Sequence, residues 1–324
     1  MASTAKLVCP VCEHEETFFV FAGDDRLLRT SPKIFGLYRC ARCRAGFLNP
    51  QPTEDEMRQA YPAPYWWVTG GPSRSLVSRL ERAYREVMLQ RHVQMARRFL
   101  PCPRPRLLDV GCGSGTFLHL LRRAAGIEGE GLEVSAEAAA AARTAYGLTI
   151  HTGSIDGVDF PEASYDFITM FHVLEHLPQP RKALLKIRTW LAPKGVLLLQ
   201  VPNYDSLQAR LLGERWIGFD IPRHLIAFTP SSLQLLLAAA GFVPSQPHYY
   251  CPREDAPCIA SSLVPSLDPV AISISQDAPF ASLRKAAYFG LVLAAQPFAL
   301  AEAWLKKGGM MFVAATLKDP SDVG

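Results

Sequence analysis

The chain has 324 residues, 49% of them hydrophobic, and this length and composition predict about two globular domains with a sizeable core. Lysine and arginine outnumber the acidic residues by 34 to 30, so the formal charge of +4 neither requires nor excludes an anionic partner. Residues 18–22 (FFVFA) form an apolar run that is too short for the core of a signal peptide. We therefore expect a cytoplasmic protein whose 8 cysteines do not form disulfides.

Two cysteine pairs near the N-terminus have the spacing of zinc ligands. Cys9 and Cys12 form the first C-x-x-C pair, and Cys40 and Cys43 form the second. Four thiolates can close a tetrahedral shell around Zn²⁺ and stabilise a segment that is too small to have its own core. We therefore predict a zinc-ribbon domain over residues 1–52 with a structural zinc ion. Chance pairs and a redox dithiol are the alternatives.

Residues 53–104 are predicted to form a linker and an amphipathic helix. The junction YPAPYWW is aromatic and broken by proline, and Tyr65, Trp66 or Trp67 is expected either near the substrate pocket or buried against the core. Residues 75–100 place apolar side chains at helical spacing, with arginines between them. Those arginines could contact phosphates, although a solvated helix face is the more common meaning of this pattern.

From residue 105 onward, strands and helices alternate, which is typical of a parallel sheet with helices on both faces. The first strand ends at Asp109, and glycines follow at positions 111, 113 and 115, where they let the backbone approach a ligand closely. Thr116 replaces the last glycine of the dinucleotide fingerprint, and Asp109 would repel a pyrophosphate but suits an ammonium group. Glu133 ends the next strand, where a carboxylate can accept both hydrogen bonds of a ribose diol. An ammonium group and a ribose together indicate S-adenosylmethionine.

In these motifs the sequence resembles the class I S-adenosylmethionine-dependent methyltransferases over residues 105–250. The matching stretches are LDVGCGSG, GLEVS, SYDFITMFHVLEHLPQP and LAPKGVLLLQVPN. The resemblance implies an enzyme whose α/β domain over residues 105–324 has a Rossmann-like seven-stranded sheet with helices on both faces. The cofactor contacts that it implies come from Asp109, Gly111 and Gly113 to the methionine moiety, from Glu133 to the ribose, from Ser154 and Ile155 to the adenine, and from His172 beside the cofactor.

The segment HVLEH follows the strand YDFITMF directly. H-x-x-E-H is also a zinc-peptidase pattern, but a metallopeptidase needs it on a helix with a distant third ligand. His172 is instead predicted at the carboxyl end of a central strand, where open α/β sheets hold their ligands. Glu175 and His176 lie one helical turn further and either act in catalysis or cap and pack that turn. His172 and Glu175 are accordingly candidate catalytic residues.

Two resemblances bear on the methyl acceptor. A four-cysteine domain ahead of a methyltransferase core is similar to the deoxysugar C-methyltransferases, and residues 202–242 resemble the ubiquinone-type O-methyltransferases. They imply a small-molecule acceptor, such as a sugar, a glycolipid or a secondary-metabolite intermediate. Two alternatives stay open: an RNA methyltransferase that uses the ribbon and the arginine-rich helix, and a cofactor-binding module without catalysis.

The stretch FDIPRHLIAFTP contains the predicted catalytic base, His224. An acceptor hydroxyl or acidic carbon must lose its proton, and a histidine that titrates near neutrality suits this task. The stretch resembles the Tyr-His-Glu-His-Leu segment of the deoxysugar C-methyltransferases, in which the final histidine is the proposed base. Arg223 stands at the glutamate position, so Asp220 or Glu175 would have to supply the supporting carboxylate. The alternatives are an anchoring histidine that bonds a backbone carbonyl, and His172 as the base.

A helical insertion is predicted at residues 253–308, between the strand GFVPSQPHYY and the last strand GGMMFVAATLK. Its apolar run covers residues 286–295 and then meets Gln296 and Pro297, so it is too short to span a bilayer, which takes about 20 residues. We expect a helical hairpin that caps the pocket or forms a homodimer contact. Interfacial membrane contact through residues 281–307 is the alternative, and no transmembrane span is expected.

Overall fold

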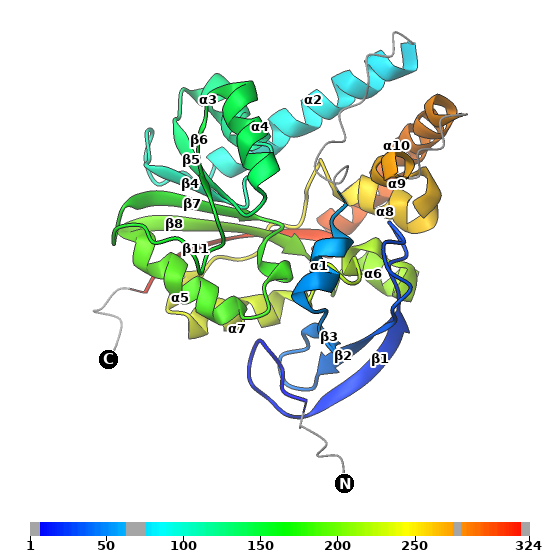
Figure 1. Ribbon diagram of the computed structural model, residues 1–324, viewed down its shortest axis with the longest axis horizontal. Coiled ribbons are helices and arrows are strands. Elements are labelled where there is room, and N and C mark those ends of the chain that lie inside the picture. The colour runs from blue at the N-terminus through cyan, green and yellow to red at the C-terminus, as the bar shows by residue number, and fades with distance from the viewer. Residues whose placement is uncertain (1–6, 63–75, 275–279, 319–324) are drawn as a thin grey trace.

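The computed structural model describes residues 7–62, 76–274 and 280–318, which form two β-sheets and the helices that pack on them (Figure 1). The larger sheet has seven strands in the order β10-β11-β8-β7-β4-β5-β6. They are β4 (Leu107–Val110), β5 (Gly129–Glu133), β6 (Thr149–Thr152), β7 (Tyr165–Phe171), β8 (Leu191–Pro202), β10 (Phe242–Pro244) and β11 (Met310–Leu317). β11 is antiparallel to β8 and β10, whereas the other pairs are parallel. The predicted Rossmann-like seven-stranded fold is confirmed.

Helices cover both faces of this sheet because successive strand residues point to opposite sides. Leu197 and Leu199 pack in one hydrophobic cluster, and Leu198 between them packs in another. The first cluster is covered by α5 (Pro180–Trp190) and α7 (Pro230–Ala239). The second is covered by α2 (Leu76–Arg97), α3 (Thr116–Ala125) and α4 (Ala136–Tyr146). The amphipathic helix expected at 75–100 is therefore α2, whereas Tyr65, Trp66 and Trp67 lie outside the described residues.

The smaller sheet has the order β1-β2-β3-β9 and joins the N-terminal segment to the rest of the chain. Its strands are β1 (Thr17–Gly23), β2 (Phe35–Cys40), β3 (Gly46–Asn49) and β9 (Ile226–Ala227). Gly46 pairs with Ala227, and Phe47 pairs with Ile226, so the edge strand comes from the segment that follows His224. Strand hydrogen bonds thus cross the domain boundary predicted at residue 52. α1 (Glu54–Ala60) follows this sheet and begins with a capping box at Thr53.

Short helices lead from the sheet into the loops at its carboxyl edge. They are η2 (Leu174–His176), α6 (Leu207–Leu212), η3 (Gly213–Arg215) and η4 (Ile217–Phe219). The predicted helical insertion lies between β10 and β11. It consists of α8 (Asp255–Leu263), η5 (Pro265–Leu267), α9 (Pro269–Ile274) and α10 (Ala281–Trp304).

α10 is longer than the apolar run in the sequence suggested, because the helix continues through Pro297. A proline leaves the carbonyl four residues earlier without its helical donor, and here that residue is Leu293. Leu293 and Pro297 are both exposed, so water can bond the carbonyl. By length and apolar composition alone, α10 would suffice to cross a membrane.

Candidate active site

The loop after β4 holds the predicted cofactor-binding glycines. Gly111, Gly113 and Gly115 have φ values of +73°, +54° and +73°, in the left-handed region that favours glycine. A Cβ on Gly111 would lie 2.3 Å from Cγ2 of Val173, and a Cβ on Gly115 would lie 2.6 Å from Cδ1 of Leu148. A Cβ on Gly113 would meet no atom within 4 Å. Packing therefore requires glycine at 111 and 115, whereas Gly113 borders open space that a ligand can enter.

Two carboxylates flank this loop, as predicted from the strand ends. Asp109 is 3% exposed and accepts a hydrogen bond of 2.6 Å from Thr169 Oγ1. Burial raises the pKa of Asp109 to about 7, although the Thr169 bond lowers it in part. Glu133 accepts the N–H of Gly113 at 2.8 Å and the N–H of Ser135 at 2.9 Å, one on each carboxylate oxygen. Each of these oxygens keeps a further lone pair for a ligand hydroxyl.

The two residues predicted at the adenine edge lie just after β6. Ser154 is exposed, and its hydroxyl accepts the N–H of Gly157 at 3.1 Å. Ile155 is 8% exposed and packs in the hydrophobic cluster under α5 and α7. The structure thus leaves the Ser154 hydroxyl free to donate, whereas Ile155 contributes a backbone and an apolar surface.

His172 lies at the carboxyl end of β7, as predicted, and both of its ring nitrogens face carboxylates. Its Nδ1 lies 3.0 Å from Glu175 Oε1, and its Nε2 contacts Glu254, which also accepts a hydrogen bond from the Gln200 amide. Burial alone would lower the pKa of His172, but Glu254 and Glu175 outweigh it and raise that pKa to about 10. The two carboxylates beside its ring therefore favour the protonated form of His172.

His224 presents a different arrangement. Its Nδ1 lies 2.8 Å from the carbonyl oxygen of Gly218, so this nitrogen carries the hydrogen and donates it. The lone pair is then on Nε2, which lies 3.9 Å from Glu175 Oε1. The side chain is 11% exposed. Of the two carboxylates considered for supporting His224, the structure places Glu175 against its Nε2. The anchoring bond of the alternative hypothesis is also present.

Glu175 is enclosed by histidines. Its side chain is 0% exposed, and its Oε2 has no hydrogen-bond partner among the described residues. Burial would raise the pKa of Glu175, but the neighbouring histidines, first His172, hold it below its usual value. His176 bonds the Arg223 carbonyl oxygen at 2.9 Å through Nδ1, and burial lowers the pKa of His176 to about 4. One ligand atom from each of Glu175, His176 and His224 lies within 4.8 Å of the others.

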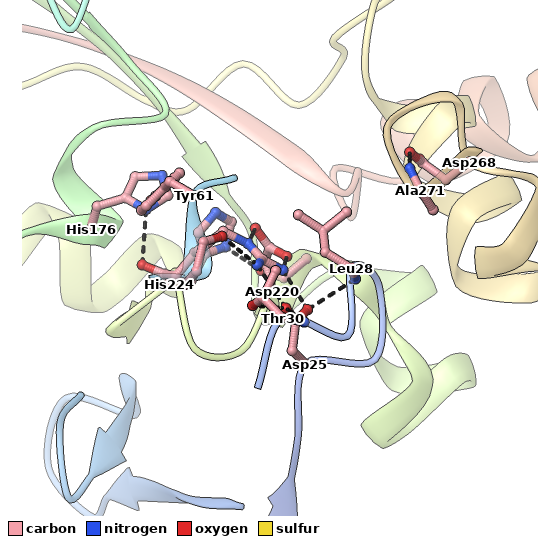
Figure 2. A network of polar contacts seen from close by, with 12 residues as sticks. Asp25, Leu28, Thr30, Tyr61, His176, Asp220, His224, Asp268 and Ala271 are labelled. Atoms are coloured by element: carbon pink, nitrogen blue, oxygen red, sulfur yellow. Dashed lines mark hydrogen bonds and ion pairs between the residues drawn. The ribbon is translucent and has the colours of Figure 1, made fainter. Parts of the chain in front are cut away.

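The loop that carries His224 is held by a buried ion-pair network, part of which Figure 2 shows. Arg223 is 0% exposed, and its Nη2 lies 2.7 Å from Asp25 and 2.6 Å from Asp220. Its Nη1 donates to the carbonyl oxygen of Ala60 at 3.0 Å. Asp25 follows β1, and Ala60 ends α1, so the N-terminal segment fixes the backbone on which His224 stands.

Sequence reasoning did not identify three of these side chains as site residues. Asp25 lies in the predicted zinc ribbon and Glu254 in the predicted helical insertion, and both reach the site only through the fold. Arg223 was noted only because it stands at the glutamate position of the Tyr-His-Glu-His-Leu segment. Its position three residues after Asp220 was a usable signal, because that spacing allows an ion pair within one turn.

The four predicted zinc ligands come together at the N-terminal sheet. The Sγ atoms of Cys9 and Cys43 are 3.6 Å apart, and those of Cys12 and Cys40 are 3.5 Å apart. Tetrahedral zinc with Zn–S bonds of about 2.3 Å places its sulfurs about 3.8 Å apart. The geometry of this cluster therefore suits a four-thiolate zinc site.

Two cavities, of about 260 and 510 Å³, lie between β1 and the segment around η3 and η4. The smaller is lined in part by Asp220, and the larger by Arg39, Tyr204 and Arg210. Neither is lined by His172, Glu175 or His224.

Comparison with known proteins identifies proteins that are similar to this chain. Residues 80–246 match the sequence model of a family described as "Methyltransferase domain". An uncharacterized 37.1 kDa protein of a Streptomyces fradiae transposon is 33% identical over 132 residues, which cover 39% of this chain and 36% of that protein. A ubiquinone biosynthesis O-methyltransferase of Xanthomonas campestris is 28% identical over 189 residues, which cover 54% of this chain and 75% of that enzyme.

Solved structures with a similar fold have lower identity. The cyclopropane synthase MmaA2 from Mycobacterium tuberculosis is 17% identical, with a TM-score of 0.46, and the match covers 70% of this chain and 82% of that one. An S-adenosylmethionine-dependent methyltransferase from Mesorhizobium loti is 17% identical, with a TM-score of 0.41, over 65% of this chain and 90% of that one.

Proposed function

Because the chain belongs to the methyltransferase domain family, we propose that it transfers a methyl group from S-adenosylmethionine to a small molecule, with His224 as the general base. The observation that carries the proposal is the orientation of His224: Gly218 holds Nδ1, which leaves the lone pair on Nε2, 3.9 Å from Glu175 Oε1. Val173 touches Gly111, so the histidine cluster and the cofactor loop are neighbours.

The residues of the loop fit S-adenosylmethionine. Gly113 borders open space, Asp109 is a buried carboxyl that an ammonium group would stabilise as an anion, and Glu133 keeps lone pairs for a ribose diol. Ser154 and Ile155 would contact the adenine. When bound, the cofactor supplies a methyl group on a positively charged sulfur, which a nucleophile displaces in line.

The histidine cluster would prepare the acceptor. His224 Nε2 accepts the proton of an acceptor hydroxyl or acidic carbon, and the imidazolium that forms is stabilised by the anionic Glu175 beside it. The protonated form of His172 cannot take that proton, so the part of His172 is to hold Glu175 and Glu254 in place at the carboxyl end of β7. The difference in their surroundings favours His224 over His172 as the base.

A sugar, glycolipid or secondary-metabolite intermediate is the proposed acceptor class. The Xanthomonas relative is named for O-methylation in ubiquinone biosynthesis, which supports a small acceptor that is methylated at a hydroxyl. To test the proposal, the protein is incubated with S-adenosylmethionine and a metabolite extract, and products heavier by about 14 Da per methyl group are sought by mass spectrometry. Omission of the cofactor is the control. Methylation found only in an RNA fraction would refute the small-molecule assignment.

We also propose that Cys9, Cys12, Cys40 and Cys43 bind one structural Zn²⁺. Four thiolates leave no open coordination position, so the ion stabilises the N-terminal segment and takes no part in the reaction. Cys40→Ser should lose the metal and destabilise this segment, whereas Cys102→Ser, at an exposed cysteine, should change neither. Elemental analysis combined with thermal unfolding measures both. A stable, active Cys40→Ser protein without zinc would contradict the proposal.

A further inference from the structure

α10 carries a long surface without charged groups. Every exposed residue of this helix except Ser282 is apolar or glycine. We define the apolar face of α10 by Leu283, Ala287, Gly290, Leu293, Pro297, Leu300 and Trp304, which recur every three or four residues and therefore lie on one side of the helix. Leu283 is 66% exposed, Leu300 is 51% exposed and Trp304 is 83% exposed. An exposed apolar surface of this length marks a docking site.

The charges around this face are mainly positive. The single acid of α10, Glu302, is 0% exposed and accepts hydrogen bonds from Gln208 and Gly309 inside the protein. Lys285 stands near the start of the helix, and Lys306 just follows its end. Lysines therefore lie near both ends of α10 in the sequence, and no acid of this helix is exposed along the apolar face.

α2 lies beside α10 and adds to this charge. The rings of Tyr84 and Phe289 meet at 5.5 Å, and Figure 1 shows both helices projecting on the same side of the molecule. α2 carries exposed arginines at 79, 82 and 85 against one exposed acid, Glu86, and Arg85 pairs with Glu81. Basic side chains thus stand next to an apolar surface, a combination that suits a bilayer with anionic headgroups.

We propose that the apolar face of α10 docks on the surface of an anionic lipid bilayer, with the helix lying along the membrane. A second copy of the chain is a less favourable partner than the bilayer. In a twofold contact between two such faces, Lys285 and Lys306 of one chain would lie near the lysines of the other, and like charges repel. Crossing the bilayer is disfavoured because the opposite side of α10 packs on α8, with Tyr288 and Val292 buried in that contact. The proposal does not depend on the proposed reaction.

Flotation of the full chain with vesicles tests the docking. The protein should float with phosphatidylcholine vesicles that contain phosphatidylglycerol, and less with phosphatidylcholine alone. Leu293→Glu with Leu300→Glu should reduce the bound fraction at least about tenfold, because two leucines leave the lipid and two charges repel it. Leu185→Glu with Leu211→Glu is the matched control, since both leucines are exposed on other helices. Lys285→Gln with Lys306→Gln should weaken the preference for phosphatidylglycerol.

Thermal unfolding of each variant establishes that it is folded before flotation. Equal flotation of the α10 variant and the control variant would overturn the proposal, as would no flotation of the parent protein. A dimer in light scattering that disappears in the Leu293→Glu, Leu300→Glu protein, without vesicle binding, would instead assign the face to a second copy.

Discussion

The glycine loop and the histidine cluster adjoin at the carboxyl edge of the sheet, but they are built in opposite ways. The groups proposed to bind the cofactor at the glycine loop lie within one stretch of the chain, and they are backbone atoms and two carboxylates at the ends of β4 and β5. The cluster is assembled from the turn after β7, the loop that carries His224, Glu254 just before α8, and the N-terminal segment. A short local sequence therefore encodes the first site, whereas the second exists only when distant segments are packed together.

The largest effect should come from breaking the ion-pair network that holds the cluster. Arg223→Met would leave Asp25 and Asp220 buried without their cation, which should lower the free energy of unfolding by about 3–5 kcal/mol. Arg210→Met is the control, because that arginine is exposed and pairs with Asp205 at the surface, and it should cost less than about 1 kcal/mol. Urea unfolding compares the two variants. Equal midpoints would show that the cluster does not need the network.

His224→Ala separates the chemical role of the cluster from its assembly. Turnover should fall at least about 10²-fold, equivalent to about 2.7 kcal/mol, while cofactor binding stays unchanged. His224→Asn keeps a side-chain N–H that can donate to the Gly218 carbonyl but has no basic nitrogen. If His224 is the base, both substitutions should reduce turnover by the same factor. Normal turnover in His224→Asn would show that His224 only anchors the loop through its hydrogen bond to the Gly218 carbonyl oxygen.

A pH titration sharpens the description of the loop. The pKa of Asp109 is raised to about 7, so the ligand-free protein loses stability when Asp109 ionises as the pH rises. A bound ammonium group would stabilise the ionised carboxylate and offset this loss. Cofactor binding should therefore release a proton below pH 7, and affinity should rise up to about tenfold per pH unit and level off above pH 7. Calorimetry of the parent protein and of Asp109→Asn measures this. A pH-independent parent affinity would contradict it.

The smallest effect is expected within the loop itself. Gly113→Ala meets no neighbouring atom, so only the strain of its positive φ, about 1 kcal/mol, should be lost from stability. Gly115→Ala should cost more, because its Cβ would lie 2.6 Å from Leu148 and 3.0 Å from Ala142. Cofactor affinity should show the opposite order: Gly113→Ala should weaken cofactor binding more than Gly115→Ala does. If Gly113→Ala destabilises as much as Gly115→Ala, the open space beside the loop is filled.

These contrasts explain what the sequence could predict. The sheet, its helices and the cofactor loop were predicted because strand periodicity, glycine positions and carboxylates at strand ends are local signals, and the resemblance to class I methyltransferases is confirmed by the family match. His224 was predicted as the base because its stretch resembles the Tyr-His-Glu-His-Leu segment of the deoxysugar C-methyltransferases. Asp25 and Glu254 could not be found, because Asp25 is 198 residues from Arg223 and Glu254 is 82 residues from His172, and only packing brings these segments together.

The pairing of β3 with β9 also fixes an order of events during synthesis. Phe47 is made early, but its partner Ile226 leaves the ribosome only after most of the methyltransferase sheet. Until then β3 has an open edge, and the N-terminal sheet lacks its fourth strand. Excision of the cysteine-bearing segment would therefore remove the fourth strand of its sheet, because that strand follows His224.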